Sequence, residues 1–377
     1  MKHLISLLAF SFLIGCDGEK SNAAPSEGSD IQLHSEKDQV SNEVTSLFEA
    51  YSTTEKSNTP SSKGSLEEVA SKTKPPEAVS VKPNFEYKIQ GDTVTITGCD
   101  KNVSGALIIP VTIEGKPVTG IGKSAFSRCY SLTSIRIPDS VTSIGKEAFS
   151  SCSSLTSIKI PDRVTSIGKY AFSSCSDLTS ITIPDGVTSI GERAFSSCMK
   201  LLAIEVGAGN ISYADVDGVL FNKKKTLLVT YPKGKKGTNY DVPDGVATIG
   251  VAAFYECRSL RSITISDGGT SIGEEAFHAC SSLTSITIPD SVTRIGDYAF
   301  VHCTSLRSIA IPAAVEVIRN GVFDNCTSLT KLIFLGDAPQ DKTGLINTFP
   351  TIYRNPESKG WEDKWSRRPV KLITENP

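Results

Sequence analysis

Apolar and polar residues follow the same order every 23 residues over much of this chain. In the copy at 138–160 the recurring apolar positions are Val141, Ile144, Ala148, Phe149, Cys152, Leu155, Ile158 and Ile160. The last part of LTSIKI (155–160) alternates between apolar and polar residues, as a half-buried strand does. Pro161 follows and ends that strand, because proline cannot donate a hydrogen bond to a sheet. A fixed period of this length predicts a solenoid.

The next part of the repeat predicts a second short extended piece and a turn. Residues 164–167 (VTSI) are extended in pattern, and Gly168 permits the change of direction that follows. Residues 169–172 (KYAF) fit a single helical or 3₁₀ turn with the alanine and phenylalanine inward. One copy alone buries too little surface to offset the entropy of ordering its backbone. The copies must therefore stack into one cooperative array.

Eight cysteines mark the repeat, and their spacing argues against disulfides between copies. They are Cys129, Cys152, Cys175, Cys198, Cys257, Cys280, Cys303 and Cys326. Equivalent atoms on adjacent strands lie about 4.8 Å apart, whereas a disulfide places its Cβ atoms about 3.8 Å apart. We expect a buried ladder of reduced cysteines that act as small apolar side chains. Cys99 lies outside this register, and its state stays open.

The order Cys-x-x-Leu-x-x-Ile-x-Ile-Pro, then Val-x-x-Ile-Gly and Ala-Phe, resembles the BspA-like (Treponema-type) leucine-rich repeat family. The resemblance covers the array at 116–334, and a β-rich N-terminal cap at 84–115 fits the same family. It implies a leucine-rich-repeat solenoid, a curved right-handed superhelix with a parallel β-sheet on the concave face. Short extended, 3₁₀ or helical turns would form the convex face. Gly269, Ser266 and Arg319 depart from the pattern, and Arg319 replaces the turn glycine near the end of the array.

Two segments interrupt or close the array. The cysteine interval of 59 residues contains an insertion at 207–242, whose apolar runs 219–221 and 227–231 predict a β-hairpin or a coil with an extended arm. The segment 335–377 carries Trp361 and Trp365, and we interpret it as a C-terminal cap over the last coil.

The N-terminal segment predicts export and a lipid anchor. A cationic start and an apolar run predict a lipoprotein signal peptide at 1–15. Leu13-Ile14-Gly15-Cys16 resembles the bacterial lipobox, which makes Cys16 the lipidated residue that holds the chain at the membrane. Asp17 resembles an inner-membrane retention signal of some bacteria. The sequence therefore leaves open which of the two membranes holds the anchor. Residues 16–83 are rich in Ser, Thr, Glu, Lys and Pro and predict a disordered tether.

Catalytic and metal-binding patterns are absent from the sequence. It contains no HExxH or P-loop motif, and its frequent serines belong to the repeat and lack a partnered base. His278 and His302 fall on neighbouring repeats, and exposed side chains are the simpler interpretation than a metal site. The formal net charge is −2, which gives no overall signature of nucleic-acid binding. We expect no enzyme activity and no cofactor.

Recognition is expected on the outward positions of the repeat strands. The candidate partner-binding residues on the concave face are Ser134, Arg136, Ser157, Lys159, Ser180, Thr182, Glu205, Thr264, Thr287 and Lys331. These hydroxyls also suit an ordinary solvated strand, and that alternative stays open. Lys223, Lys224 and Lys225 form a candidate anion-contact arm, which together with Lys233, Lys235 and Lys236 is the densest basic cluster. A solvated arm without a ligand is the other interpretation.

These patterns together predict a non-catalytic, lipid-anchored recognition or adhesion protein. Its partner would be an extracellular or envelope protein or glycan, bound by a monomeric chain at the outer membrane or surface of a bacterial cell. The alternative is a structural envelope scaffold or assembly platform without a dedicated ligand.

Overall fold

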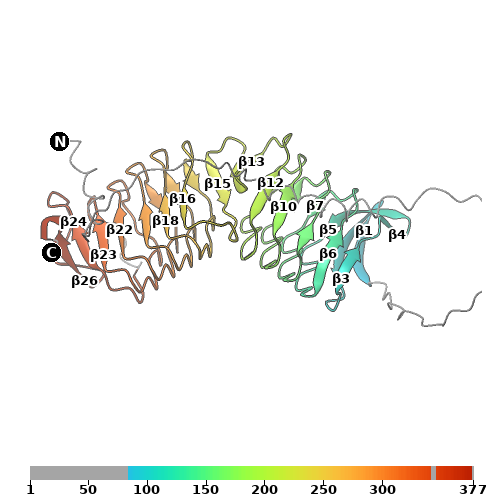
Figure 1. The fold of residues 1–377 in the computed structure, drawn as a ribbon, viewed down its shortest axis with the longest axis horizontal. Coiled ribbons are helices and arrows are strands. Elements are labelled where there is room, and N and C mark those ends of the chain that lie inside the picture. The colour runs from blue at the N-terminus through green and yellow to red at the C-terminus, as the bar shows by residue number, and fades with distance from the viewer. Residues whose placement is uncertain (1–83, 341–344, 376–377) are drawn as a thin grey trace, which may run out of the picture. The chain divides into compact units, whose positions relative to one another are not determined.

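A computed structural model describes residues 84–340 and 345–375 of the 377-residue chain. The predicted signal peptide, Cys16 and the tether all lie outside the described residues. Within the described part, strands follow one another coil by coil from β1 to β26 (Figure 1), and the single helical segment is a short 3₁₀ helix, η1 (Ile373–Glu375).

Each coil contributes to two rows of strands. The first, here called the Ile-x-Ile row, is built from the LTSIxI segments. Its strands are β3 (Gly105–Ile108), β6 (Leu132–Arg136), β8 (Ser157–Ile158), β10 (Ser180–Ile183), β12 (Ala203–Val206), β16 (Asn239–Asp241), β18 (Ser262–Thr264), β20 (Ser285–Thr287), β22 (Ser308–Ile311), β23 (Lys331–Phe334), β24 (Thr351–Arg354) and β26 (Arg368–Leu372). The paired strands of this row are parallel, and β25 (Lys364–Trp365) joins β26 antiparallel at the end.

The second row, here called the Ile-Gly row, is built from the VTSIG segments and from the cap. Its strands are β1 (Phe85–Gln90), β2 (Thr93–Cys99), β5 (Lys116–Ile121), β7 (Ser143–Ile144), β9 (Ser166–Ile167), β11 (Ser189–Ile190), β13 (Tyr213–Val216), β14 (Val219–Asn222), β15 (Leu227–Thr230), β17 (Thr248–Ile249), β19 (Ser271–Ile272) and β21 (Arg294–Ile295). β1 and β2 form an antiparallel hairpin, β4 (Thr112–Ile113) pairs with β5, and from β2 to β11 the pairing is parallel. The predicted solenoid of parallel strands is confirmed.

The turn after the repeat glycine differs from the expected conformation. Residues 169–172 form neither a helical nor a 3₁₀ turn, and Tyr170 and Ser174 have left-handed φ angles of 59° and 60°. Alternate amides here point in different directions. Ala171 N–H donates within its own coil to Gly168 O (3.1 Å), whereas Phe172 N–H donates to Ala194 O of the next coil (2.8 Å). The segment is therefore a hydrogen-bonded turn and not a helix: the Ala171 amide keeps an i→i+3 bond, but the Tyr170 and Phe172 amides donate to the next coil.

The repeat glycine is required by the close approach of adjacent coils. A Cβ atom on Gly145 would lie 2.7 Å from the Gly122 carbonyl carbon, and one on Gly296 would lie 2.5 Å from the Glu274 nitrogen. Arg319 occupies the equivalent position one repeat later, and the Ile-Gly row ends at β21, just before it. The loss of the glycine therefore coincides with the loss of the ladder on this side of the coil.

The core consists of two stacks of aromatic rings. Phe126, Phe149, Phe172 and Phe195 stack at centroid distances of 5.2, 5.4 and 5.8 Å, with rings within 5° of parallel. A second stack begins at Tyr231. It continues through Phe254, Phe277, Phe300 and Phe323. The buried residues likewise fall into two clusters that divide at the insertion.

The insertion is a two-turn meander that ends by rebuilding a coil. β13 and β14 pair antiparallel, as do β14 and β15, and β15 then pairs parallel with β17. Tyr231 follows β15 and takes the place of the repeat phenylalanine: its N–H donates to Ala253 O at 2.8 Å. The residues after it reach β16, which restarts the Ile-x-Ile row.

At the C-terminal end, strands and aromatic side chains cover the last coil. β24 and β26 continue the sheet of β22 and β23. Phe334 contacts both tryptophans, with centroid distances of 5.1 Å to Trp361 and 5.2 Å to Trp365. Trp365 is only 1% exposed, so the apolar end of the stack is closed by these side chains.

Candidate functional site

The outward side chains of the Ile-x-Ile row form columns with one residue per coil. Residues in register include Ser134 with Ser157, Thr182 with Glu205, and Thr264 with Thr287. The inward neighbours are buried isoleucines, so strand alternation places the outward residues on the surface. Of the predicted residues, those classed as exposed are Arg136, Ser157, Lys159, Ser180, Thr182, Glu205, Thr264 and Thr287, and those half-buried are Ser134 and Lys331.

The polar groups on this surface contact each other between coils. The Thr182 hydroxyl donates to the Glu205 carboxylate at 3.3 Å, and the Lys331 ammonium lies 5.8 Å from the centre of the Tyr353 ring. Hydroxyls both donate and accept hydrogen bonds, so a column of them can contact many polar groups of a partner.

The insertion divides this surface. The Ile-x-Ile ladder stops at β12 and restarts at β16, with β13 to β15 between them in the chain (Figure 1). Asn239 and Asp241 of β16 are exposed and stand in register with Ser262 and Thr264. The sequence prediction missed these two residues because the cysteine register is interrupted here. Val242-Pro243, which matches the Ile-Pro end of the other repeat strands, was the available signal.

The candidate anion-contact arm is the turn between β14 and β15. Lys223, Lys224 and Lys225 are all exposed there. Asn222 builds the turn: its side-chain oxygen accepts hydrogen bonds from the amides of Thr226 (2.8 Å) and Leu227 (2.9 Å). The three lysines therefore lie on a hydrogen-bonded turn, and they are separated along the chain from Arg136 and Lys159.

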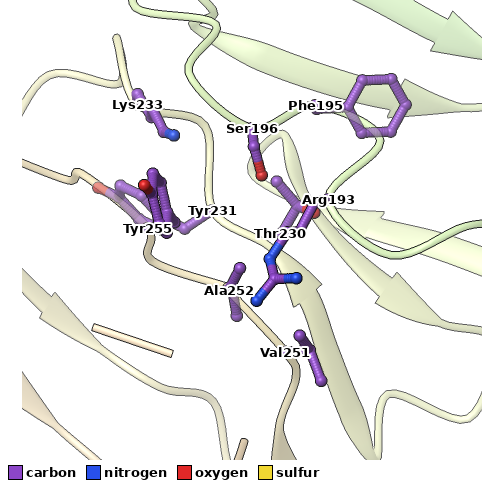
Figure 2. Close-up of a pocket in the computed structure, with 10 residues that line it drawn as sticks. Arg193, Phe195, Ser196, Thr230, Tyr231, Lys233, Val251, Ala252 and Tyr255 are labelled. Atoms are coloured by element: carbon purple, nitrogen blue, oxygen red, sulfur yellow. The ribbon is translucent and has the colours of Figure 1, made fainter. Parts of the chain in front are cut away.

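Lys233 does not belong to an exposed basic arm. Its side chain is 6% exposed, its ammonium lies 3.9 Å from a Glu256 carboxylate oxygen, and it sits 4.9 Å from the Tyr255 ring centre. Burial lowers the pKa of Lys233. Figure 2 shows Lys233 beside Tyr255 at the junction between the insertion and the following coil. Its role is to pack this junction, so the basic cluster is smaller than the sequence suggested.

A second charged contact spans the same junction. Arg193, from the coil before the insertion, lies 3.2 Å from Glu274 and 2.9 Å from Glu275 of a coil after it. The Ser197 hydroxyl donates to Glu256 at 2.7 Å. Arg193 and Lys233 also line a cavity of about 10 Å³ (Figure 2), which is the size of one water molecule. The cavity is too small for a substrate or cofactor, and the cluster acts as a structural clamp.

The two histidines do not form a metal site. His278 and His302 lie with their ring centres 5.7 Å apart, and His278 stacks on Tyr255 at 4.7 Å. Burial is the main cause that lowers the pKa of His278. Within residues 84–340 and 345–375, no group of three or more His, Cys, Asp or Glu side chains is placed to hold a metal ion.

The eight repeat cysteines are buried thiols without disulfide bonds. Seven of them have their sulfur against a backbone carbonyl of the preceding coil, as Cys152 does with Phe126 (3.1 Å) and Cys280 with Phe254 (3.1 Å). Burial raises the pKa of Cys152 to about 12, which keeps it a neutral thiol. These seven cysteines fill the core as small buried side chains.

The two rows of short parallel strands, the repeated buried positions and the polar outward columns define a leucine-rich-repeat solenoid protein. The family model described as the BspA type leucine rich repeat region matches residues 107–226 and 231–339, in six copies. This covers more than half of the chain, and the protein belongs to that family. The resemblance seen in the sequence is confirmed.

Solved structures of bacterial proteins share the fold. The pneumococcal vaccine antigen PcpA is 20% identical, with 78% of this chain and 92% of that chain covered and a TM-score of 0.57. A leucine-rich repeat protein from Eubacterium ventriosum is 27% identical, with 70% and 82% covered and a TM-score of 0.52. No curated protein matches the chain. Among the described residues, no helix has the length and apolar character needed to cross a membrane.

Proposed function

We propose that this chain is a non-catalytic recognition or adhesion protein of a bacterial cell envelope. A lipid on Cys16 anchors it at the outer membrane or cell surface, and the Ile-x-Ile row binds a protein or glycan partner. The observation that carries the proposal is the set of outward columns. One polar side chain per coil is presented in register on a rigid parallel ladder, while the other face of each strand is buried.

The chemistry of the columns favours an extended polar partner. Strands about 4.8 Å apart repeat the same hydroxyl, so a partner can make many weak contacts along the row. Arg136 and Lys159 add positive charge in the first coils, and Glu205 adds negative charge at β12. A glycan chain or an extended polypeptide offers hydroxyl, amide and carboxylate groups over such a length. Specificity would then come from the order of charges along the row.

A charge-reversal experiment tests the placement of the site. The full chain is assayed against a panel of immobilised polysaccharides and extracellular matrix proteins. The test variant carries Arg136→Glu, Lys159→Glu and Lys331→Glu, and the matched control reverses the three lysines at 223–225. We expect roughly tenfold or greater loss of affinity in the test variant and retained binding in the control. Unchanged binding of every ligand by the test variant would refute the placement on this row.

The same panel separates recognition from a purely structural role. A scaffold without a dedicated ligand would bind no member of the panel above the level of an unfolded control. A reaction catalysed by the chain and abolished by one substitution would overturn the non-catalytic assignment. The anchor is tested by Cys16→Ser, which should move the protein from the membrane fraction to the soluble fraction. Continued membrane partition of that variant would refute the lipid at Cys16.

A further inference from the structure

Cys99 and Cys129 form a pair unlike the other cysteines of the described chain. Cys99 is the last residue of β2 in the N-terminal cap, and Cys129 is the first cysteine of the repeat. Their sulfur atoms lie 3.5 Å apart, although 30 residues separate them along the chain. Both are buried, with Cys99 6% exposed and Cys129 fully covered.

The repeat explains why this pair differs. Each later cysteine has the carbonyl of an aromatic residue, 26 residues earlier, as its sulfur's partner. Cys129 has no complete coil before it, and the cap places the Cys99 sulfur against it in that position. A disulfide needs the two sulfur atoms to approach to about 2.05 Å, which rotation of the cysteine side chains can supply over so short a gap.

The surroundings of the pair also favour thiol chemistry. The hydrogen bond between the two sulfur atoms lowers the pKa of Cys129 and raises the pKa of Cys99, and the charge of Lys101 lowers both. Lys101 is held close by, with its ammonium 3.4 Å from the Ala125 carbonyl oxygen. The cysteines deeper in the ladder have raised pKa values because burial penalises their thiolates.

We propose that Cys99 and Cys129 are a redox-active pair that forms a disulfide between the N-terminal cap and the first coil. The oxidant is a disulfide of the thiol–disulfide exchange class, such as oxidised glutathione or an oxidised dithiol oxidoreductase. The pair loses one proton, the remaining proton passes to the Cys129 sulfur, and the Cys99 sulfur, which is the more exposed of the two, attacks a sulfur of the oxidant. A mixed disulfide forms and one oxidant sulfur leaves as a thiol. The Cys129 thiolate then attacks the Cys99 sulfur and displaces the second oxidant sulfur. In total, two protein thiols and one oxidant disulfide become one protein disulfide and two small thiols.

The bond would fix the N-terminal end of the array. The terminal coil of a repeat protein has a neighbour on one side only, so opening begins there. A crosslink between β2 and the turn that carries Cys129 would restrict separation of the cap from the first coil. The other seven cysteines would stay reduced, because each faces a carbonyl and not a second sulfur.

Thiol counting and crosslink mapping test the proposal. The full chain with Cys16→Ser keeps nine cysteines, all among the described residues. It is incubated with oxidised glutathione in two arms, once folded and once during refolding from denaturant. Samples are then denatured, alkylated and digested without reductant. We expect seven alkylated cysteines (nine minus two) and a crosslinked peptide pair containing residues 99 and 129. Its mass should be about 2 Da below the sum of the reduced peptides, since two hydrogens are lost.

Matched variants make the outcome specific. Cys152→Ser should keep the 99–129 crosslink, whereas Cys99→Ser should lose it and show eight alkylated cysteines. Oxidation should raise the midpoint of thermal unfolding by several degrees in the parent chain but not in Cys99→Ser. Nine alkylated cysteines in both arms of the parent chain, or a crosslink between any other pair, would overturn the proposal.

Discussion

Asn210 offers a sharp test of how the insertion is held against the first coils. It is a fully buried polar residue with both sides of its amide satisfied. The side-chain nitrogen donates to Pro184 O (2.7 Å) and Val187 O (3.0 Å). The side-chain oxygen accepts from the amides of Ser212 and Tyr213, each at 2.8 Å. Asn210→Ala removes all four of these hydrogen bonds, of which the two to Pro184 O and Val187 O are buried.

The magnitude follows from these four bonds. A hydrogen bond contributes about 1 kcal/mol net, so Asn210→Ala should lower the local free energy of opening by about 3 to 4 kcal/mol. Asn222→Ala is the matched control, because Asn222 also accepts two backbone hydrogen bonds but at an exposed turn. Water can replace its lost partners, and the expected cost is about 1 kcal/mol or less.

Hydrogen exchange measures both changes locally. In the parent chain the amides of Ser212 and Tyr213 should be protected, and Asn210→Ala should reduce that protection by at least about 100-fold. The amides of Thr226 and Leu227 report Asn222→Ala, which should reduce protection by about fivefold or less. Equal losses in the two variants, or a loss below tenfold for Asn210→Ala, would refute the view that burial makes this amide essential.

Three further substitutions test the stack, the coil spacing and the response to pH. Phe149→Ala should lower the free energy of unfolding by about 3 to 5 kcal/mol in a denaturant titration, because its ring is fully buried between two others; a cost below about 1 kcal/mol would contradict it. Gly296→Ala should lower the thermal midpoint, since its Cβ would meet the Glu274 nitrogen at 2.5 Å, whereas Gly268→Ala meets nothing closer than 4.0 Å. Similar midpoints for the two glycine variants would show that the coils can separate without cost. His278 has a pKa below its ordinary 6.5. The unfolded chain therefore binds this proton first as pH falls, and the free energy of unfolding should drop from about pH 6.5 downward. His278→Gln should flatten that drop in urea titrations at a series of pH values, and an unchanged slope would exclude His278 as its source.

The inward positions could be predicted because equivalent side chains make equivalent contacts in every coil. Phe149 contacts Phe126 and Phe172 in the same way that Phe277 contacts Phe254 and Phe300. A residue type that recurs in register packs against the same residue types in each coil. Eight copies of one pattern therefore identify the buried positions more reliably than one copy can. Strand alternation accounts for the exposure of most of the outward hydroxyls on the same strands.

The turn and the insertion could not be predicted in detail from local patterns. The KYAF segment has helical spacing, but the amides of Tyr170 and Phe172 bond to the next coil, and no property of a single copy shows that. The sequence groups Lys233 with the other lysines of the insertion, which suggests an exposed side chain. In the structure its ammonium lies against the Tyr255 ring. The proximity of Cys99 to Cys129 was also hidden, because Cys99 stands outside the 23-residue register.

The same geometry separates the residues that hold the fold from those that could choose a partner. An inward residue contacts coils on both sides, so its substitution disturbs three coils at once. An outward residue of the Ile-x-Ile row, such as Ser157 or Thr287, is exposed on its own strand, and substitutions there should change stability by little. The surface can therefore vary in charge and hydrogen bonding without loss of the array. Arg136 and Lys159 lie near one end of the row, Glu205 and Asp241 lie beside the break in the ladder, and Lys331 lies near the other end. The order of charges is consequently a property that selection can act on independently of the core.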